Sequence, residues 1–296
     1  MAARVLLLLL ALAGTGQARA EEARVIPALY PEGPLWQGDK LYFAEMRADR
    51  ITVVDAAGPR AFFEQEGCGP TAIAPYGEGF VVLCHLGARL VAVDATGKEL
   101  RRWRRARPGL LLGRPNDASA DGKGGIYFSR PGIFGLGWAP RGWIMHLSAD
   151  GVLRPIAGRL DYPNGVHVAG DVLYVSEHLR GRILRYDIED GGRLGRPRTF
   201  VDLAKIPRPA RYRSPYPLTG PDGLEIGPDG NLYVALYGEG RLLKFSPGGE
   251  LLGMMEFPAR YLTNVAFGRP GVAVTGAFDN QSQESPGEVR ILSAPP

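Results

Sequence analysis

The sequence predicts an all-β chain, folded as a six-bladed β-propeller with four antiparallel strands in each blade and an N-terminal strand closing the last blade. Three observations predict this fold. One pattern, a short apolar strand, a Gly/Asp turn and a second apolar strand, returns at intervals of about 40 to 60 residues. No stretch has sustained helical periodicity. The last repeat has room for only three strands before the sequence ends.

Six copies of the pattern can be superimposed on one another. Their innermost strands are expected to start at these residues: Glu32, Thr71, Asn116, Asn164, Asp222 and Asn264. Turns such as Gly38-Asp39 and Asp229-Gly230 lead into the next strand, and two strands joined by a tight Gly/Asp turn form a β-hairpin. A β-sandwich is the alternative fold, but it would not require the same hairpin at every step.

The sixth repeat lacks an outer strand, whereas residues 23–28 precede the first repeat and have no other evident role. We expect this N-terminal segment to supply the missing strand, because closure hides an exposed sheet edge. Two repeats carry long insertions, residues 130–142 and 204–220. Long irregular connections are often functional, and we expect the second to form a lid, with plain surface loops as the alternative.

Residues 1–20 have the pattern of a secretory signal peptide. Arg4 precedes an apolar run over residues 5–13, and Ala18-Arg19-Ala20 is a small-x-small cleavage site. The apolar run is much shorter than the roughly 20 residues that a membrane span needs. We therefore expect a chain that is periplasmic or secreted, with residues 21–296 forming a single propeller domain.

The charge of the chain argues against a nucleic-acid partner. The formal net charge is +4, and removing Arg4 and Arg19 with the signal peptide lowers it to +2. One basic run remains, consisting of Arg101, Arg102, Arg104, Arg105 and Arg107. Such a run can bind an anionic surface, but charges also block pairing at an outer edge strand, and we favour the second interpretation.

Two cysteines, Cys68 and Cys84, fall in one proposed blade. An oxidising compartment permits them to pair. Two separate buried thiols are the alternative.

The six residues that start the repeats would all point toward the propeller axis from one end. Five carry a carboxylate or amide oxygen, and the sixth is a threonine. Each one alone is typical of a turn, but a ring of converging polar side chains needs a shared partner. Glu32 and Asp222 with two Asn residues supply hard oxygen ligands, which suit Ca²⁺ better than Zn²⁺. We expect one divalent metal ion, with Ca²⁺ preferred over other divalent ions.

Five short motifs resemble, in the same order, those of the gluconolactonase and regucalcin family, which includes the luciferin-regenerating enzymes. The motifs are Glu32-Gly-Pro, Pro115-Asn116-Asp117, Pro163-Asn164-Gly165, Gly220-Pro221-Asp222-Gly223-Leu224 and Thr263-Asn264-Val265-Ala266-Phe267-Gly268. Members of this family are six-bladed propellers with a catalytic divalent metal, and the best-known ones hydrolyse sugar lactones. The resemblance extends from the first motif to the last blade.

The resemblance also implies roles for individual residues. The implied metal ligands are Glu32, Asn116, Asn164 and Asp222. Asn116 would also face the substrate, and Asn264 would be an outer member of the metal shell. Arg114 matches an arginine of the family that contacts substrate.

His85 is a further candidate, because the run from Val81 would bring it to the metal end of the second repeat. Bacterial gluconolactonases often have a histidine at the matching place, and the run is similar to one in the serum paraoxonases. The ordinary pKa of histidine suits a general base, with a hydrogen-bonded structural histidine as the alternative. His178 is a weaker candidate, and His146 and His167 are expected to be strand residues.

The third repeat departs from the family pattern over residues 128–135, where Arg130 takes the place of an acid. If this loop lines the pocket, the substrate need not be gluconolactone and can carry a negative charge.

The leading hypothesis is hydrolysis of a small-molecule lactone or related ester. The metal would polarise the carbonyl, stabilise the oxyanion and lower the pKa of a bound water, and Asp222 or His85 would take the proton. The alternative is a non-catalytic propeller with a structural metal that binds a small ligand or a protein partner, because this fold hosts both roles. The sequence leaves the oligomeric state open.

Overall fold

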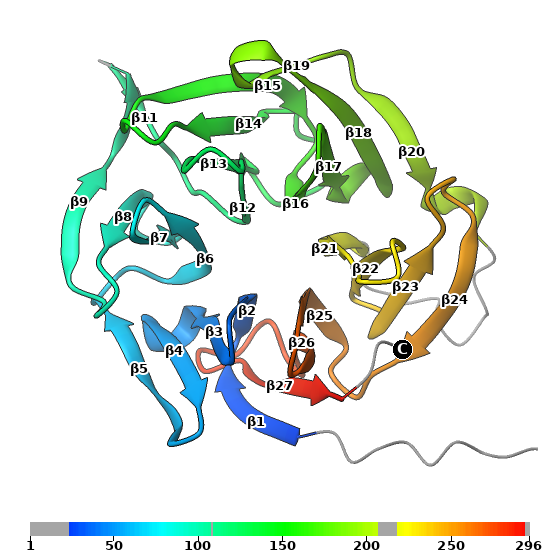
Figure 1. Cartoon of the computed structure of the whole chain (residues 1–296). Coiled ribbons are helices and arrows are strands. Elements are labelled where there is room, and N and C mark those ends of the chain that lie inside the picture. Colours follow the sequence, from blue (N-terminus) through cyan, green and yellow to red (C-terminus); the bar gives the residue numbers. More distant parts are fainter. Residues whose placement is uncertain (1–23, 108, 207–217, 294–296) are drawn as a thin grey trace, which may run out of the picture.

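The chain forms a ring of antiparallel sheets around a central axis in the computed structural model, which describes residues 24–107, 109–206 and 218–293 (Figure 1). The predicted signal peptide and residues 207–217 of the predicted lid lie outside the described residues. Within the described part, helical structure is limited to four short 3-10 turns. None of these described residues form a helix long and apolar enough to cross a membrane. The predicted all-β propeller fold is confirmed.

Four separate sheets of four or five strands follow one another along the chain. The first contains β2 (Pro31–Gln37), β3 (Lys40–Glu45), β4 (Arg50–Asp55) and β5 (Gly58–Glu64). The second contains β6 (Pro70–Tyr76), β7 (Gly79–Cys84), β8 (Arg89–Val93) and β9 (Glu99–Trp103). The third contains β12 (Ala118–Ala120), β13 (Ile126–Arg130), β14 (Gly142–Leu147) and β15 (Leu153–Leu160). The fourth contains β16 (Pro163–Ala169), β17 (Val172–Glu177), β18 (Arg182–Glu189), β19 (Arg193–Leu194) and β20 (Arg198–Asp202).

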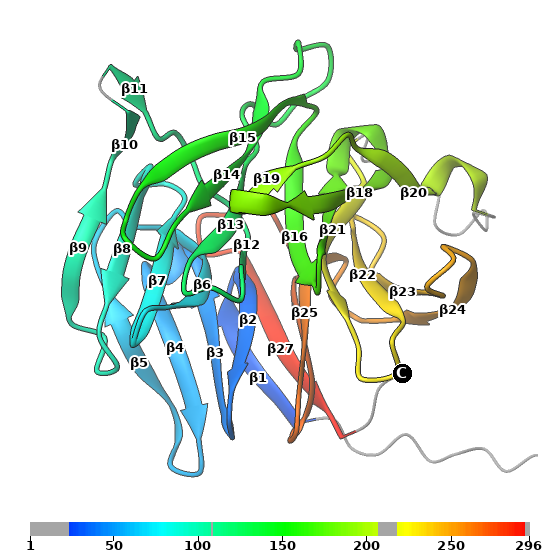
Figure 2. The same cartoon turned by 45° about the horizontal axis from the view of Figure 1, so that its top comes forward.

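A larger sheet of eight strands completes the described ring. Its first half is β21 (Gly220–Ile226), β22 (Leu232–Tyr237), β23 (Arg241–Phe245) and β24 (Leu251–Glu256). Its second half is β25 (Tyr261–Gly268), β26 (Gly271–Ala277), β27 (Pro286–Leu292) and β1 (Arg24–Leu29). A single pairing, Tyr237 with Tyr261, joins the halves. β1 pairs with β27 along its whole length, so the two ends of the described chain lie side by side (Figure 2).

A two-stranded hairpin of β10 (Arg105–Arg107) and β11 (Leu110–Leu111) connects the second sheet to the third. β9 is the outermost strand of its sheet, and the side chains of Arg101 and Arg102 on it are exposed. This position agrees with charged residues on an outer edge strand.

The hydrophobic core lies between neighbouring sheets. One buried cluster, for example, joins Val81 and Leu90 of the second sheet to Phe128 and Met145 of the third. Burying an aliphatic or aromatic side chain of this kind contributes about 1.5 to 3 kcal/mol. Because each sheet uses both faces in this way, the inner strands β2, β6, β12, β16, β21 and β25 are held around the axis (Figure 1).

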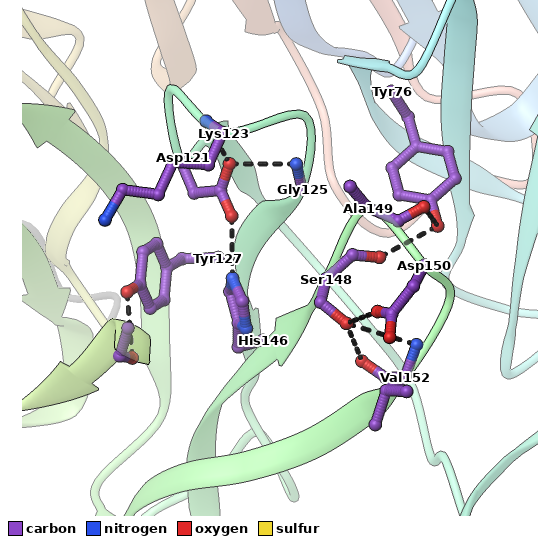
Figure 3. Close-up of polar contacts among 11 residues, drawn as sticks. Tyr76, Asp121, Lys123, Gly125, Tyr127, His146, Ser148, Ala149, Asp150 and Val152 are labelled. Atoms are coloured by element: carbon purple, nitrogen blue, oxygen red, sulfur yellow. Dashed lines mark hydrogen bonds and ion pairs between the residues drawn. The ribbon is translucent and has the colours of Figure 1, made fainter. Parts of the chain in front are cut away.

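Polar contacts reinforce this stacking around the third sheet (Figure 3). The Tyr76 hydroxyl of the second sheet donates to the Ser148 carbonyl at 3.0 Å, and the Tyr127 hydroxyl donates to the Gly192 carbonyl at 2.9 Å. Inside the third sheet, His146 Nε2 lies 2.8 Å from Asp121 Oδ2. His146 is therefore a strand residue with a structural partner, as expected.

Candidate functional site

Five of the inner strands share one irregularity close to the axis. The register with the neighbouring strand shifts after Glu32, Pro70, Pro163, Pro221 and Leu262. A β-bulge of this kind places an extra residue in one strand and redirects its side chain. The shifts in β6, β16 and β21 span Thr71, Asn164 and Asp222, so these residues leave the regular alternation of the strand.

In the third sheet no bulge is needed to release Asn116 from the regular alternation of a strand, because β12 begins two residues after it. The Asn116 N–H donates to the Ser129 carbonyl at 2.9 Å, and the Ser129 N–H donates to the Asp117 carbonyl at the same distance. These bonds fix the backbone of the Asn-Asp step beside β13.

Glycine after the predicted ligand lets neighbouring inner strands approach each other. A Cβ atom at Gly165 would lie 2.3 Å from the Asp222 carbonyl oxygen, and one at Gly223 would lie 2.0 Å from Asn264 Cγ. No residue with a side chain fits at either distance without moving the backbone or its neighbour. Close packing of neighbouring inner strands therefore explains why glycine follows Asn164 and Asp222 in the sequence motifs.

One cavity of about 210 Å³ lies where these residues converge. Its wall includes the four predicted metal ligands and both predicted bases, with Asp222 counted in both groups: Glu32, Asn116, Asn164, Asp222 and His85. The four predicted ligands are only 3 to 7% exposed. Residues from five different sheets of the ring are thus brought to one place. The wall of this cavity carries four oxygen-bearing side chains from the predicted ligand set.

Two other members of the predicted ring have different surroundings. Thr71 lines the cavity, but its hydroxyl donates to the Asn116 carbonyl at 2.6 Å. Asn264 lines a second cavity, of about 200 Å³, farther along the inner strands with Asp117 and Glu225. Its amide Nδ2 donates to Asp117 Oδ1 at 3.3 Å. Asn264 therefore supports Asp117 in this structure.

The predicted substrate contacts are placed differently from one another. Asn116 lines the cavity, whereas Arg114 is exposed and is not among the described residues of the cavity wall. The positive charge of Arg114 nevertheless contributes to lowering the pKa of His85, so the two lie near each other. Arg130 is not among the described wall residues either, and a Cβ atom at Gly113 would lie 2.5 Å from its Nε. From the same loop, Phe134 lines the cavity.

Burial raises the pKa of three carboxyls near the axis, and for two of them neighbouring carboxyls raise it further. Burial, followed by the charges of Asp222 and Asp117, raises the pKa of Glu32 well above its usual value. Burial and then Asp117 raise the pKa of Asp222 in the same way. Burial raises the pKa of Asp117 to about 7, although hydrogen bonds from Val166 N–H and Asn264 act against it. Sequence reasoning assigned no role to Asp117, and its only signal was its place in the Asn116-Asp117 motif.

The surroundings of Asp222 fit a bound cation. Its Oδ1 is buried and has no hydrogen-bond partner. A buried carboxylate oxygen without a partner is costly, and a positive charge beside it would remove that cost. The described residues contain no group of three or more His, Cys, Asp and Glu able to hold a metal by themselves. The cavity instead combines two carboxylates with two amides, a set of oxygen donors that suits Ca²⁺.

The tautomer of His85 follows from its neighbours. Its Nδ1 lies 2.9 Å from the Pro115 carbonyl, which can only accept, so Nδ1 carries the proton and Nε2 keeps a lone pair. Burial, with a smaller contribution from Arg114, lowers the pKa of His85 to about 4. The ring is therefore neutral at pH 7 and is a weak base.

The chain on either side of His85 is held by covalent and backbone bonds. Cys84, the preceding residue, forms a disulfide with Cys68, which decides between the two predicted states of the cysteines. The His85 N–H donates to the Gly69 carbonyl at 3.0 Å. The end of β7 is thus tied to the start of β6 next to the cavity.

His178 has a structural arrangement although it also lines the cavity. Its Nδ1 lies 3.1 Å from the Pro221 carbonyl, and its Nε2 lies 3.0 Å from the Leu218 carbonyl. Both ring nitrogens therefore contact the segment that leads into Asp222. Burial lowers the pKa of His178 to about 4, so the neutral ring donates its one N–H to one of these carbonyls, and its other nitrogen lies against the second carbonyl.

Comparisons with known proteins agree with this geometry. Residues 30–274 match the family model described as the SMP-30/Gluconolactonase/LRE-like region. Lactonase drp35 of Staphylococcus haemolyticus is 28% identical over 249 residues, covering 77% of this chain and 70% of the relative. Lactonase drp35 of Staphylococcus aureus (strain USA300) is 30% identical over 209 residues, covering 67% of this chain and 60% of the relative. The chain thus spans 60 to 70% of the length of these two relatives.

Solved structures with low sequence identity share the fold. A luciferin-regenerating enzyme has 21% identity and a TM-score of 0.74, covering 92% of this chain and 95% of its own. A gluconolactonase from Xanthomonas campestris has 23% identity and a TM-score of 0.72, covering 93% and 91%. Regucalcin from Agrobacterium tumefaciens, described as a calcium-binding protein, has 19% identity and a TM-score of 0.71, covering 90% of each chain. Since the family model matches most of its length, the chain belongs to the SMP-30/gluconolactonase/LRE-like family.

Proposed function

We propose that the chain is a metal-dependent hydrolase of a lactone or related ester. The proposed ligands of its divalent cation, Ca²⁺ by preference, are Glu32, Asn116, Asn164 and Asp222. The observation that carries the proposal is the unpartnered, buried Asp222 Oδ1 in a cavity lined by a second carboxylate and two amides. The lactonase names of the relatives and the calcium-binding description of regucalcin support it.

A bound divalent cation would supply Lewis acidity toward a carbonyl oxygen. The side chains of the cavity would orient the substrate and accept the proton that the attacking water loses. Asp222 is the proposed proton acceptor, because its carboxylate lines the cavity and one oxygen is not engaged by the protein. His85 is the second candidate, through Nε2, but its pKa of about 4 makes it the weaker base. Asn116 and Arg114 are the proposed substrate contacts.

We also propose a count of six blades. The eight-stranded sheet would be two four-stranded blades, since only the Tyr237–Tyr261 pairing joins its halves, and β1 would close the last blade through its pairing with β27. Residues 21–296 would form this single domain after removal of residues 1–20. The Cys68–Cys84 disulfide supports export to the periplasm or the outside of the cell, because such bonds persist in oxidising compartments.

The function is tested with a panel of lactones on the purified protein, before and after treatment with EDTA and after return of Ca²⁺. We expect turnover of at least one lactone, its loss in EDTA and its recovery with Ca²⁺. Elemental analysis should show one divalent ion per chain. If no lactone is turned over in a chelator-sensitive way, the proposal is wrong. A chain that binds one ion and hydrolyses nothing would instead be a non-catalytic metal-containing propeller that binds a small ligand or a protein.

A further inference from the structure

One side of the cavity is a continuous wall of aromatic rings. Four of its members contact one another: Phe134, Tyr162, His178 and Tyr237. The ring centroids of Phe134 and Tyr162 are 4.8 Å apart, those of Phe134 and His178 are 5.5 Å apart, and those of His178 and Tyr237 are 5.7 Å apart. These separations are typical of direct edge and tilted contacts between rings. We call these four residues the aromatic wall.

Several polar atoms of the aromatic wall lie against polar atoms of the protein and not toward the cavity's reacting side chains. Both nitrogens of His178 contact main-chain carbonyls. The Tyr237 hydroxyl lies 2.9 Å from the Tyr30 hydroxyl and accepts a hydrogen bond from Asn280 Nδ2 at 2.9 Å. The wall therefore presents mainly ring faces and edges to the cavity. A substrate with many hydroxyl groups would lose bonds to water there without equal replacement.

The loop between β13 and β14 extends this apolar character to the rim of the cavity. Phe134 lines the cavity and is still 38% exposed. Ile133 and Leu136 of the same loop are also exposed apolar residues. An exposed apolar side chain that lines a cavity, as Phe134 does, is typical of a ligand-binding site. None of the described residues that line the cavity is Lys or Arg, so this described part of the wall offers no basic side chain to an anionic substituent.

Resting on the lactonase function proposed above, we infer that the aromatic wall binds an apolar substituent, aryl or alkyl, carried by the lactone ring. The preferred substrates would then be apolar-substituted lactones, with sugar lactones turned over poorly. Phe134 determines this specificity, because it joins the rim to the wall and contacts three other rings. The polar ligand side of the cavity would take the ester group, while the wall takes the substituent.

The test compares δ-decalactone with glucono-δ-lactone, which share a ring size but differ in polarity. For the wild type, kcat/KM should be at least about tenfold higher for δ-decalactone, in the range that an apolar pocket discriminates. The Phe134→Ala variant should raise KM for δ-decalactone by about tenfold with a small change in kcat, and leave glucono-δ-lactone nearly unaffected. Phe134→Leu should keep most of the preference. Trp138→Ala is the matched control, since Trp138 belongs to the same loop but does not line the cavity.

A binding measurement separates failure of this inference from failure of the lactonase function. Calorimetry with the δ-lactam of the same carbon skeleton as δ-decalactone reports binding without hydrolysis. Binding that Phe134→Ala weakens would support the aromatic wall even if no lactone is hydrolysed. Equal turnover of the two lactones, or equal losses for both in Phe134→Ala, would overturn the inference and leave the lactonase function standing. Absence of both turnover and lactam binding would overturn both.

Discussion

Two buried glutamates, Glu45 at the end of β3 and Glu177 at the end of β17, have surroundings unlike those of the carboxylates at the axis. Glu45 is 2% exposed and accepts hydrogen bonds from Thr52 Oγ1 at 2.6 Å, Arg50 Nε at 2.8 Å and a backbone N–H at 3.0 Å. Glu177, at the end of β17, is likewise 2% exposed. It accepts from Arg182 Nε at 2.6 Å and from a backbone N–H at 2.8 Å. Each glutamate is thus paired with an arginine five residues later.

Glu32 and Asp222 are buried to a similar degree, at 7% and 3% exposed, but neither forms an ion pair with a described residue, and Asp222 Oδ1 has no hydrogen-bond partner. The described cavity wall contains no Lys or Arg. The comparison shows that Glu45 and Glu177 receive a cation from an arginine of the same hairpin, whereas the carboxylates at the axis do not receive one from the described wall. Within the described wall no Lys or Arg compensates these carboxylates, which is consistent with the cation proposed there.

The largest effect is expected from Asp222→Asn. The substitution keeps the size of the side chain and an oxygen ligand, but it removes the charge and the basicity. Activity at saturating Ca²⁺ should fall by about 10² to 10⁴, the usual contribution of general acid or base catalysis. The melting temperature of the metal-free protein should stay the same or rise, because an uncompensated buried charge is lost.

Glu32→Gln is the matched variant, since it alters a ligand without removing the proposed base. It should mainly raise the Ca²⁺ concentration needed for half-maximal activity. Near wild-type turnover by Asp222→Asn at saturating Ca²⁺ would show that the assigned role is wrong, and His85 would become the base to test.

For the ion pair of Glu177 and Arg182 we expect the opposite, namely a loss of stability without a loss of activity. Glu177→Gln should lower the free energy of unfolding by about 2 kcal/mol, because Arg182 loses a charged partner but is itself partly exposed and can reach water. Activity per folded molecule should be unchanged. Urea denaturation followed by an assay of the same sample measures both quantities. A loss of activity as large as that in Asp222→Asn would break the distinction between the two kinds of carboxylate.

The pH dependence of stability should depend on the cation. The pKa of Asp117 is raised by burial from 3.8 to about 7, so the folded protein binds more protons than the unfolded chain between these values. Stability of the metal-free protein should therefore fall as the pH rises from about 4 to about 7. One pKa unit corresponds to about 1.4 kcal/mol, and after solvent relaxation we expect a loss of about 1 to 2 kcal/mol.

Glu32 and Asp222, whose pKa values are also raised, add to this fall in stability. Thermal unfolding in EDTA and in Ca²⁺ at several pH values measures the effect, which should be smaller in Ca²⁺. Asp222→Asn in EDTA should show a weaker dependence on pH than the wild type. The same slope with and without Ca²⁺ would mean that no cation compensates these carboxylates.

The smallest effect is expected at His85, which is hydrogen-bonded like a structural residue and also lines the cavity. Its Nδ1 is bonded to the Pro115 carbonyl as in a structural residue, and its ring lines the cavity. His85→Gln should lower kcat by about tenfold or less, since a pKa of about 4 makes a poor base at neutral pH. Comparing kcat over pH 5 to 9 for both proteins checks this. A loss beyond about 10² would favour His85 over Asp222 as the base.

Much of the fold could be predicted because it is a repeated local pattern. Each hairpin has its own Gly/Asp turn and its own alternating strands, so the position of each inner strand followed from nearby residues. The residues that start these strands are therefore brought near the axis by the repetition, and Glu32, Asn164 and Asp222 line one cavity. The six repeats also gave the short motifs a common position at the start of the inner strands, although no single motif is specific alone.

Other features depend on contacts between repeats, which no single repeat contains. Asn264 occupies the same position in its repeat as Asp222 does, but its amide bonds to Asp117 from another sheet, and it faces a different cavity. Arg130 is not among the described wall residues, whereas Phe134 of the same loop lines the cavity, and the prediction of a negatively charged substrate stays a prediction.

The sequence by itself determined the strands, their turns and the oxygen-bearing residues at the start of each repeat, since these are set by local alternation and turn chemistry. Only the tertiary structure decided which carboxylates are left without partners and which rings form the aromatic wall. Glu177 meets its arginine five residues away within one hairpin, whereas the surroundings of Asp222 come from side chains on other sheets. Burial and the charges of distant neighbours act through space, and spacing along the chain does not record them.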